Sequence, residues 1–269
     1  MMKRTERPRE TVSTQGRRWA AGTLLSILLL SAVSAVYVTK TRTADVMARK
    51  RELPVYSVER DDGRIAISFD AAWGGEKTLK ILDILDENGI KATFFLVDIW
   101  TQRFPELVKE IAARGHEIGN HSTTHPEMSK LNREKIAQEL ETMSANVESL
   151  IGQRPTLFRP PYGDYNNDVV LTARQNGYEV IQWSVDSLDW KNKGVQPLID
   201  RATKNVKSGD IVLFHNDSQY IVEALPAVLE SYRKQGLTVG PVSQVLLTGQ
   251  ITIDPQGRQR PAATTVPEV

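Results

Sequence analysis

The chain has 269 residues, of which 40% are hydrophobic and 25% charged, so it is long enough and apolar enough to bury one sizeable globular core. Its 34 Lys and Arg residues nearly balance its 33 Asp and Glu residues, and the net charge of +1 gives no reason to expect a nucleic acid partner. The absence of cysteine excludes disulfides and thiolate catalysis, so any metal site must use His, Asp, Glu, backbone or water ligands.

The N-terminal segment contains a membrane-span signal. Residues 19–38 carry no charge and are rich in Leu, Ile and Val, and about 20 such residues cross a bilayer as a helix. Basic residues before this run favour a cytoplasmic N-terminus at 1–18, although further basic residues follow the run and weaken the asymmetry. The alternative is a cleaved signal peptide, since the small residues Val33 and Ala35 fit before a cleavage point. We therefore expect a transmembrane anchor at 19–38, with cleaved secretion as the alternative.

Composition divides the rest of the chain into three parts. Residues 39–62 are charged and lack apolar periodicity, which predicts a linker. Residues 63–249 are predicted to form the globular domain. Residues 250–269 are polar and contain proline, which predicts a flexible tail.

Within the domain, short β-rich runs alternate with longer amphipathic segments, and a glycine follows most of the predicted helices. The predicted strands are 65–69, 92–97, 117–121, 156–159, 179–184, 211–215 and 237–240. Such alternation predicts parallel strands in an α/β fold, either an open doubly wound sheet or a (β/α) barrel. No glycine-rich phosphate loop follows the first strand, which disfavours a nucleotide cofactor. Polar residues instead follow several different strands, which favours an irregular or incompletely closed seven-stranded barrel.

Candidate site residues stand at these strand ends. Asp70 follows the first strand, where an isolated Asp is often only a turn cap. His121 and His125 are four residues apart, so that one turn of chain can bring both imidazoles to a zinc-type ion, although a pair of surface or hydrogen-bonded histidines is the alternative.

Three further strand ends carry charged or titratable side chains that a catalytic site could use. Arg159 precedes two prolines and is either a rigid partner for a carboxylate or a solvated surface charge. Asp189 follows the fifth strand and His215 ends the sixth, and a carboxylate bonded to an imidazole would fix its tautomer for proton transfer. Trp190 is either part of this site or part of the core.

Together these segments resemble the NodB-homology polysaccharide deacetylases, carbohydrate esterase family 4. The resemblance runs from about residue 64 to 247 and includes five motifs in order: Ser-Phe-Asp-Ala at 68–71, His-Ser-Thr-Thr-His at 121–125, Arg-Pro-Pro-Tyr-Gly at 159–163, Asp-Ser-Leu-Asp-Trp at 186–190 and Leu-Phe-His at 213–215. The sequence Phe-Asp-Ala-Ala-Trp-Gly from residue 69 resembles that of the sporulation-type, PdaB-like subgroup.

The resemblance implies roles for individual residues. Asp70 would be the general base, Arg159 would orient it, and Asp189 would tune His215 as general acid. His121 and His125 would bind a divalent metal, with zinc as first choice and cobalt or another ion as alternatives. The backbone near Tyr162 would stabilise the oxyanion, while Trp190 and Leu213 would contact the acetyl methyl group.

One position departs from the family pattern. Most members have a second aspartate as the third metal ligand where this chain has Ala71, so Asp70 or water would have to fill the gap. Asp98 also stands where many relatives have a small residue.

The resulting expectation is a metal-dependent hydrolase that deacetylates peptidoglycan or a related N-acetylated glycan and releases acetate. It would be anchored in the membrane, with its catalytic domain in the cell or spore envelope. The alternative is a weakly active or inactive glycan-binding or spore-structural protein, because of Ala71.

Overall fold

The computed structural model describes residue 34 and residues 51–262 of the chain. Among these residues no helix is long and apolar enough to cross a membrane. The predicted span at 19–38 lies outside the described residues except for Ser34, so it stays a prediction.

The central element is strand β2 (Arg64–Ala71), because seven of its eight residues are buried. Ile65, Ile67 and Phe69 pack into the large hydrophobic cluster formed with the helices, while Ala66 belongs to a second cluster with Phe95 on the other side. Side chains alternate between the two faces of a strand, so Asp70 points away from the helix-side cluster. Both faces of the strand are covered, as a parallel sheet requires.

The main sheet is parallel, with the strand order β6-β5-β4-β3-β2-β8-β7 and with β9 paired beside the start of β2. Its other strands are β3 (Thr93–Leu96), β4 (Glu117–Asn120), β5 (Leu157–Phe158), β6 (Glu179–Val180), β7 (Val185–Asp186), β8 (Ile211–His215) and β9 (Thr238–Gly240).

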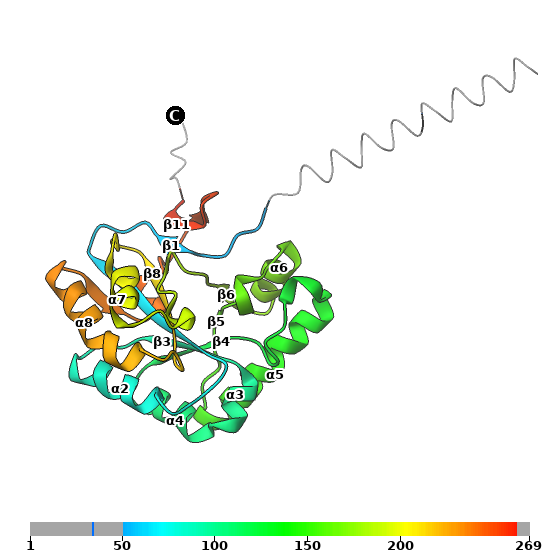
Figure 1. The fold of residues 1–269 in the computed structure, drawn as a ribbon. Coiled ribbons are helices and arrows are strands. Elements are labelled where there is room, and N and C mark those ends of the chain that lie inside the picture. Colours follow the sequence, from blue (N-terminus) through cyan, green and yellow to red (C-terminus); the bar gives the residue numbers. More distant parts are fainter. Residues whose placement is uncertain (1–33, 35–50, 263–269) are drawn as a thin grey trace, which may run out of the picture. The chain divides into compact units, whose positions relative to one another are not determined.

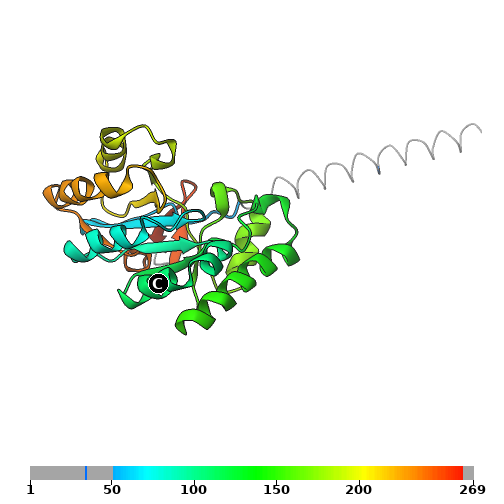
Figure 2. The same ribbon diagram turned by 60° about the horizontal axis from the view of Figure 1, so that its bottom comes forward.

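Helices connect these strands and cover the sheet (Figure 1). Figure 2 shows the green segment of α5 and the orange segment of α8 at opposite ends of the sheet. The helices are α2 (Thr78–Glu87), α3 (Asp98–Arg103), α4 (Pro105–Ala113), α5 (Arg133–Ile151), α6 (Asn167–Gln175), α7 (Val195–Thr203), α8 (Ile221–Lys234) and α9 (Val242–Val245), with short 3₁₀ turns at Met128–Lys130, Pro161–Gly163 and Asp189–Lys191.

The predicted α/β class, the parallel strands and the incomplete closure agree with this sheet. The sheet does not close into a barrel, because the edge strands β6 and β7 do not pair with each other within the described part of the chain. It is an open, curled half-barrel. The predicted strand at 179–184 contains only the two residues of β6. The chain then leaves the ladder and returns as β7, a strand that the sequence pattern did not resolve.

The domain extends beyond both expected boundaries. Strand β1 (Ser57–Val58), inside the expected linker, pairs with β11 (Arg258–Pro261), which in turn pairs with β10 (Ile251–Ile253) inside the expected tail. Val55 and Val58 are fully buried, so this segment is anchored by apolar contacts as well as by strand pairing. Strands of two to four residues leave too short a pattern to detect in the sequence.

His116 shows how the fold constrains a titratable group before β4. Its Nδ1 accepts a hydrogen bond from the backbone N–H of Ala92 at 3.2 Å, and its ring packs edge-on against Phe94. Burial, reinforced by the charge of Lys91, lowers the pKa of His116 from 6.5 to about 4. The folded protein therefore holds this imidazole neutral.

We expect the His116→Asn variant to lose part of the acid sensitivity of folding. Because protonation of His116 is harder in the folded than in the unfolded chain, its neutral form contributes stability above about pH 6.5 that is lost as the pH falls towards 4. Asparagine keeps an acceptor for Ala92 without titrating. Urea unfolding at pH 7.5 and 5 should give a smaller stability difference for the variant than for the wild type, and equal differences would contradict this.

Candidate active site

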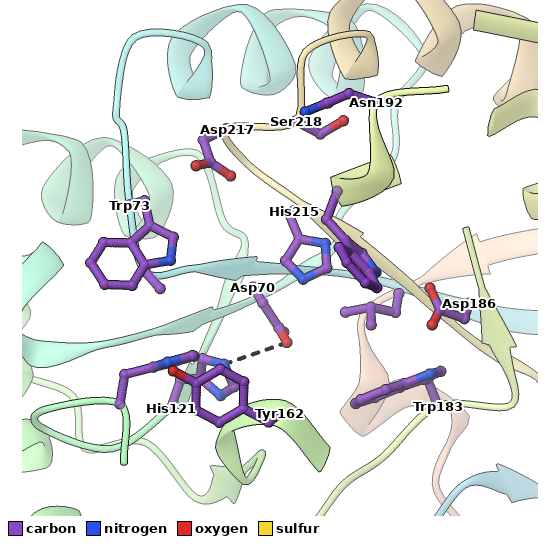
Figure 3. A pocket seen from close by; sticks show the side chains of 14 residues that line it. Asp70, Trp73, His121, Tyr162, Trp183, Asp186, Asn192, His215, Asp217 and Ser218 are labelled. Carbon is purple, nitrogen blue, oxygen red and sulfur yellow. Dashed lines mark ion pairs between the residues drawn. The ribbon is translucent and has the colours of Figure 1, made fainter. Parts of the chain in front are cut away.

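A cleft of about 590 Å³ opens at the carboxyl end of the main sheet. Parallel strands bring their carboxyl ends to one edge, and ligand sites of such folds form there. Figure 3 shows Asp70 between His121 and His215, with aromatic side chains around them. The cleft is lined by Asp70, Ala72, Trp73, His121, His125, Tyr162, Trp183, Asp186, Trp190, Asn192, Leu213, His215, Asp217 and Ser218.

Asp70 forms a buried ion pair with Arg159. The Nη1 of Arg159 donates to Oδ1 of Asp70 at 2.7 Å, and its Nη2 donates to the carbonyl oxygen of Gln182 at 3.2 Å. The guanidinium lies 4.1 Å from the centre of the Phe95 ring and is fully buried. Burial by itself would raise the pKa of Asp70, but the charge and the hydrogen bond of Arg159 oppose it, and that pKa lies below its ordinary value.

His121 has a tautomer set by the backbone. Its Nδ1 lies 2.6 Å from the carbonyl oxygen of Arg159, which can only accept, so Nδ1 carries the proton. The lone pair of Nε2 is then directed towards Oδ2 of Asp70, 3.5 Å away. Burial lowers the pKa of His121 and favours its neutral form. The lone pair of Nε2 and the carboxylate oxygen Oδ2 of Asp70 then face each other.

His125 lies beside His121, with the ring centroids 5.0 Å apart. The Tyr162 ring is 4.4 Å from His125 and the Trp73 ring is 6.1 Å from it. Burial lowers the pKa of His125 to about 4, and its buried Nδ1 has no hydrogen-bond partner among the described residues. His125 is therefore a neutral imidazole with unused ligand capacity.

His215 differs from these two histidines because the carboxylate of Asp189 is hydrogen-bonded to it. Oδ1 of Asp189 lies 2.7 Å from Nδ1 of His215, and Oδ2 accepts the backbone N–H of His215 at 2.7 Å. Burial would lower the pKa of His215, but the hydrogen bond and charge of Asp189 outweigh it and raise that pKa above 6.5. Since β2 and β8 pair Asp70 with His215, a carboxylate and a protonatable imidazole stand on neighbouring strands.

The remaining predicted site residues also lie at the cleft. Tyr162 has the left-handed φ of 59° and is 67% exposed, Trp190 is 53% exposed, and Leu213 is buried in the cleft wall. Trp190 is thus not a core residue, and Arg159 is not a surface charge. Ala71 is fully buried in the helix-side cluster and does not line the cleft.

The structure adds residues that sequence reasoning missed. Trp73, Trp183, Asp186, Asn192, Asp217 and Ser218 line the same cleft. A signal existed for three of them: Trp73 lies in the turn after β2 that carries Asp70, Asp186 begins the motif at 186–190, and Asp217 follows His215 by two residues. Trp183 lies inside the predicted strand 179–184 but in the structure follows the end of β6, so its place at the cleft could not be seen from the sequence.

The side chains at the cleft supply some of the ligands that a divalent cation needs. Two neutral imidazoles and the Oδ2 of Asp70 are ligand types that zinc accepts. Within residues 51–262, however, no group of three or more His, Cys, Asp or Glu side chains is arranged to hold a metal ion. Asp70 is already engaged by Arg159, so the site offers two ligands of its own and one that is shared.

Residues 57–181 match the polysaccharide deacetylase family. The chain is 38% identical over 196 residues to the peptidoglycan-N-acetylglucosamine deacetylase of Bacillus cereus, covering 71% of this chain and 92% of that protein. It is 34% identical to the uncharacterised protein YlxY of Bacillus subtilis over 72% of this chain, and spans 60% of the length of YlxY.

Solved structures extend the similarity to the fold. BA3943 from Bacillus anthracis, described as a CE4 family pseudoenzyme, superimposes with a TM-score of 0.69 at 32% identity, covering 71% of this chain and 68% of that chain. A mutant of BA3943 with restored enzymatic activity superimposes equally well, with 33% identity, over 71% of this chain and 70% of that chain. These findings confirm the resemblance to family 4 carbohydrate esterases, whereas the PdaB-like subgroup stays a prediction.

We expect Arg159→Gln to raise the pKa of Asp70 above its ordinary value, because burial would no longer be opposed by the guanidinium. Removal of one partner of a buried ion pair should also cost about 3–5 kcal/mol of stability. The Asp70 carboxyl signal in a ¹³C NMR titration measures the pKa directly. Arg154→Gln, which removes an exposed arginine paired with Glu141 and Glu148, is the matched control. An unchanged Asp70 pKa in Arg159→Gln would refute the assigned electrostatics.

Proposed function

Because the chain belongs to the polysaccharide deacetylase family, we propose that it hydrolyses the acetamide groups of an N-acetylated cell-wall glycan, peptidoglycan or a related polymer, and releases acetate. The similar Bacillus cereus protein named above is a peptidoglycan-N-acetylglucosamine deacetylase, and such an enzyme hydrolyses the amide bond of an amino sugar. The observation that carries the proposal is the pairing on adjacent strands of Asp70, whose pKa is lowered, with His215, whose pKa is raised.

In the proposed reaction Asp70 takes a proton from a water molecule while the oxygen of that water attacks the acetamide carbonyl carbon. The carboxylate is suited to this step because Arg159 keeps it ionised and fixes one of its oxygens, leaving Oδ2 on the side of the cleft. The C–O bond forms while the carbonyl oxygen becomes an oxyanion. The backbone N–H of Tyr162 is a suitable donor to it, since it has no hydrogen-bond acceptor in the described part of the chain.

In the second step of the proposed reaction the oxyanion collapses and the C–N bond breaks, while His215 gives its proton to the amine nitrogen. The products are acetate and a free amino sugar. Asp189 stabilises the imidazolium and holds Nδ1, which leaves Nε2 to face the substrate. Leu213 and Trp190 offer apolar surface for the acetyl methyl group, and the exposed rings of Trp73 and Tyr162 offer surface for sugar.

We propose that His121 and His125 hold a divalent cation, with zinc as first choice and Asp70 as an additional ligand. When bound, such an ion would polarise the acetamide carbonyl and lower the pKa of a water molecule. Neutral His121, with its proton fixed on Nδ1, directs a lone pair into the cleft for this purpose. With few ligands of its own, the site should bind its ion weakly.

We propose an extracytoplasmic place of action, because cell-wall glycan lies outside the cytoplasm. The predicted span at 19–38 would anchor the domain to the membrane, and a signal peptide there would release it. A sporulation role rests on the subgroup resemblance alone.

A second candidate function is glycan binding with weak or no catalysis. Two observations favour it: Ala71 replaces the expected metal ligand, and the chain is similar to a protein described as a pseudoenzyme. The cleft, its aromatic rim and the Asp70–Arg159 pair would serve binding equally well. Acetate release distinguishes the two functions.

We expect purified protein with zinc to release acetate from N-acetylated glycan, and His215→Asn to lower the turnover by about 10²–10⁴, the usual contribution of general acid–base catalysis. Zinc content should not change, because His215 is outside the proposed ligand set. His116→Asn is the matched control, since His116 lies outside the cleft. Wild-type turnover in His215→Asn would remove this residue from the mechanism, and no acetate from the wild type would favour glycan binding.

We expect Ala71→Asp to bind zinc more tightly than the wild type, because it adds an anionic ligand. The structure predicts a cost as well: Ala71 belongs to the buried helix-side cluster, so the new carboxylate reaches the histidines only if the end of β2 turns, and the melting temperature should fall. Calorimetric titration of zinc into metal-free protein measures the affinity. Equal affinities would mean that another ligand compensates for the alanine.

A further inference from the structure

The loop that carries His121 and His125 has a costly backbone conformation. Ser122 has φ of 71° and His125 has φ of 58°, in the left-handed region that residues other than glycine seldom adopt. Two local hydrogen bonds support the turn: the N–H of Ser122 donates to Oδ1 of Asn120 at 2.7 Å, and the N–H of His125 donates to Oγ of Ser122 at 3.0 Å. Such strain persists only where surrounding contacts fix the backbone.

One set of contacts comes from the start of helix α3. The N–H groups of Asp98 and Ile99 donate to the carbonyl oxygens of Ser122 and Thr123, at 3.0 and 3.3 Å. The Asp98 carboxylate, fully buried, accepts hydrogen bonds from the side chains of Thr101, Gln102 and Asn146. Since Asn146 belongs to α5, Asp98 joins α3 to α5 behind the loop.

The other set comes from one residue of α5. Oε2 of Glu139 accepts the backbone N–H groups of Thr123 and Thr124, at 2.9 and 2.8 Å. Its Oε1 accepts the hydroxyl of Thr124 at 2.8 Å, and its main-chain carbonyl accepts the hydroxyl of Thr123 at 2.7 Å. Both residues between Ser122 and His125 are therefore fixed by Glu139, so α3 holds the carbonyl groups of the loop and α5 holds its N–H groups.

We propose that Glu139 is a positioning residue whose side chain holds the loop in the strained conformation that brings His121 and His125 together. The proposal rests on the proposed function for the use of these histidines as metal ligands. It assigns Glu139 no contact with substrate. Partners of this kind typically change metal affinity by 10–100-fold when they are removed.

The chemistry of the contacts predicts which substitution is tolerated. Glutamine can place its carbonyl oxygen where Oε2 accepts two N–H groups. Its amide N–H₂ can then donate to the hydroxyl of Thr124, which can accept as well as donate. Glu139→Gln should therefore retain the loop, whereas Glu139→Ala removes the side-chain contacts and leaves only the main-chain carbonyl. Glu141→Ala is the matched control, because Glu141 lies on the same helix and pairs with exposed Arg154.

The test measures the imidazole NMR signals of metal-free protein, in which the described residues contain all four histidines of the chain. We expect Glu139→Ala to shift the signals of His121 and His125 and to leave those of His116 and His215 in place. Glu139→Gln and Glu141→Ala should resemble the wild type. Zinc affinity by calorimetry should fall by about 10–100-fold in Glu139→Ala and much less in the other two variants.

Three results would overturn the proposal: unchanged loop signals and zinc affinity in Glu139→Ala, equal disturbance by Glu139→Gln, or collapse of all four signals, which would make Glu139 a residue of general stability. The proposed function fails separately. If the wild type releases no acetate while the variants affect the loop as expected, Glu139 keeps its positioning role in a protein with another activity.

Discussion

The buried ion pair between Arg159 and Asp70 is the constraint on which the site depends. A carboxylate that is 6% exposed would take up a proton unless a cation compensated for the lost hydration. Arg159 supplies that cation from a fully buried position against Phe95, and its carbonyl oxygen also fixes the proton of His121. One residue thus sets the charge of the Asp70 carboxylate and the tautomer of His121.

The same cleft shifts the pKa values of its histidines in opposite directions. His121 and His125 are held neutral by burial, which suits ligands, while the carboxylate of Asp189 makes His215 a better proton carrier. The distinction arises from one hydrogen-bond partner, because burial lowers the pKa of all three. The division of labour therefore depends on the position of Asp189 behind β8. A glycan-binding protein would gain nothing evident from this arrangement, whereas the proposed hydrolysis uses both a neutral imidazole and a proton donor.

Much of this could be read from the sequence because strand ends converge in a parallel α/β fold. The strands that carry Asp70, His121 and His215 were predicted close to their observed bounds, and the residues do meet at one cleft. The short strands β1, β7, β10 and β11 were not found, since two to four residues show no periodicity. Glu139 was also invisible, because on sequence it is one of several acidic residues on an amphipathic helix. Its role depends on which loop lies over it.

The proposed function requires that Asp70, held ionised by Arg159, is the base of a deacetylation reaction. Acetate released from N-acetylated glycan should be measured for the wild type and Asp70→Asn, each at saturating zinc. Asparagine has nearly the same shape but cannot accept the proton, so we expect turnover to fall by about 10²–10⁴. Equal acetate release by the two proteins would contradict the proposed role of Asp70.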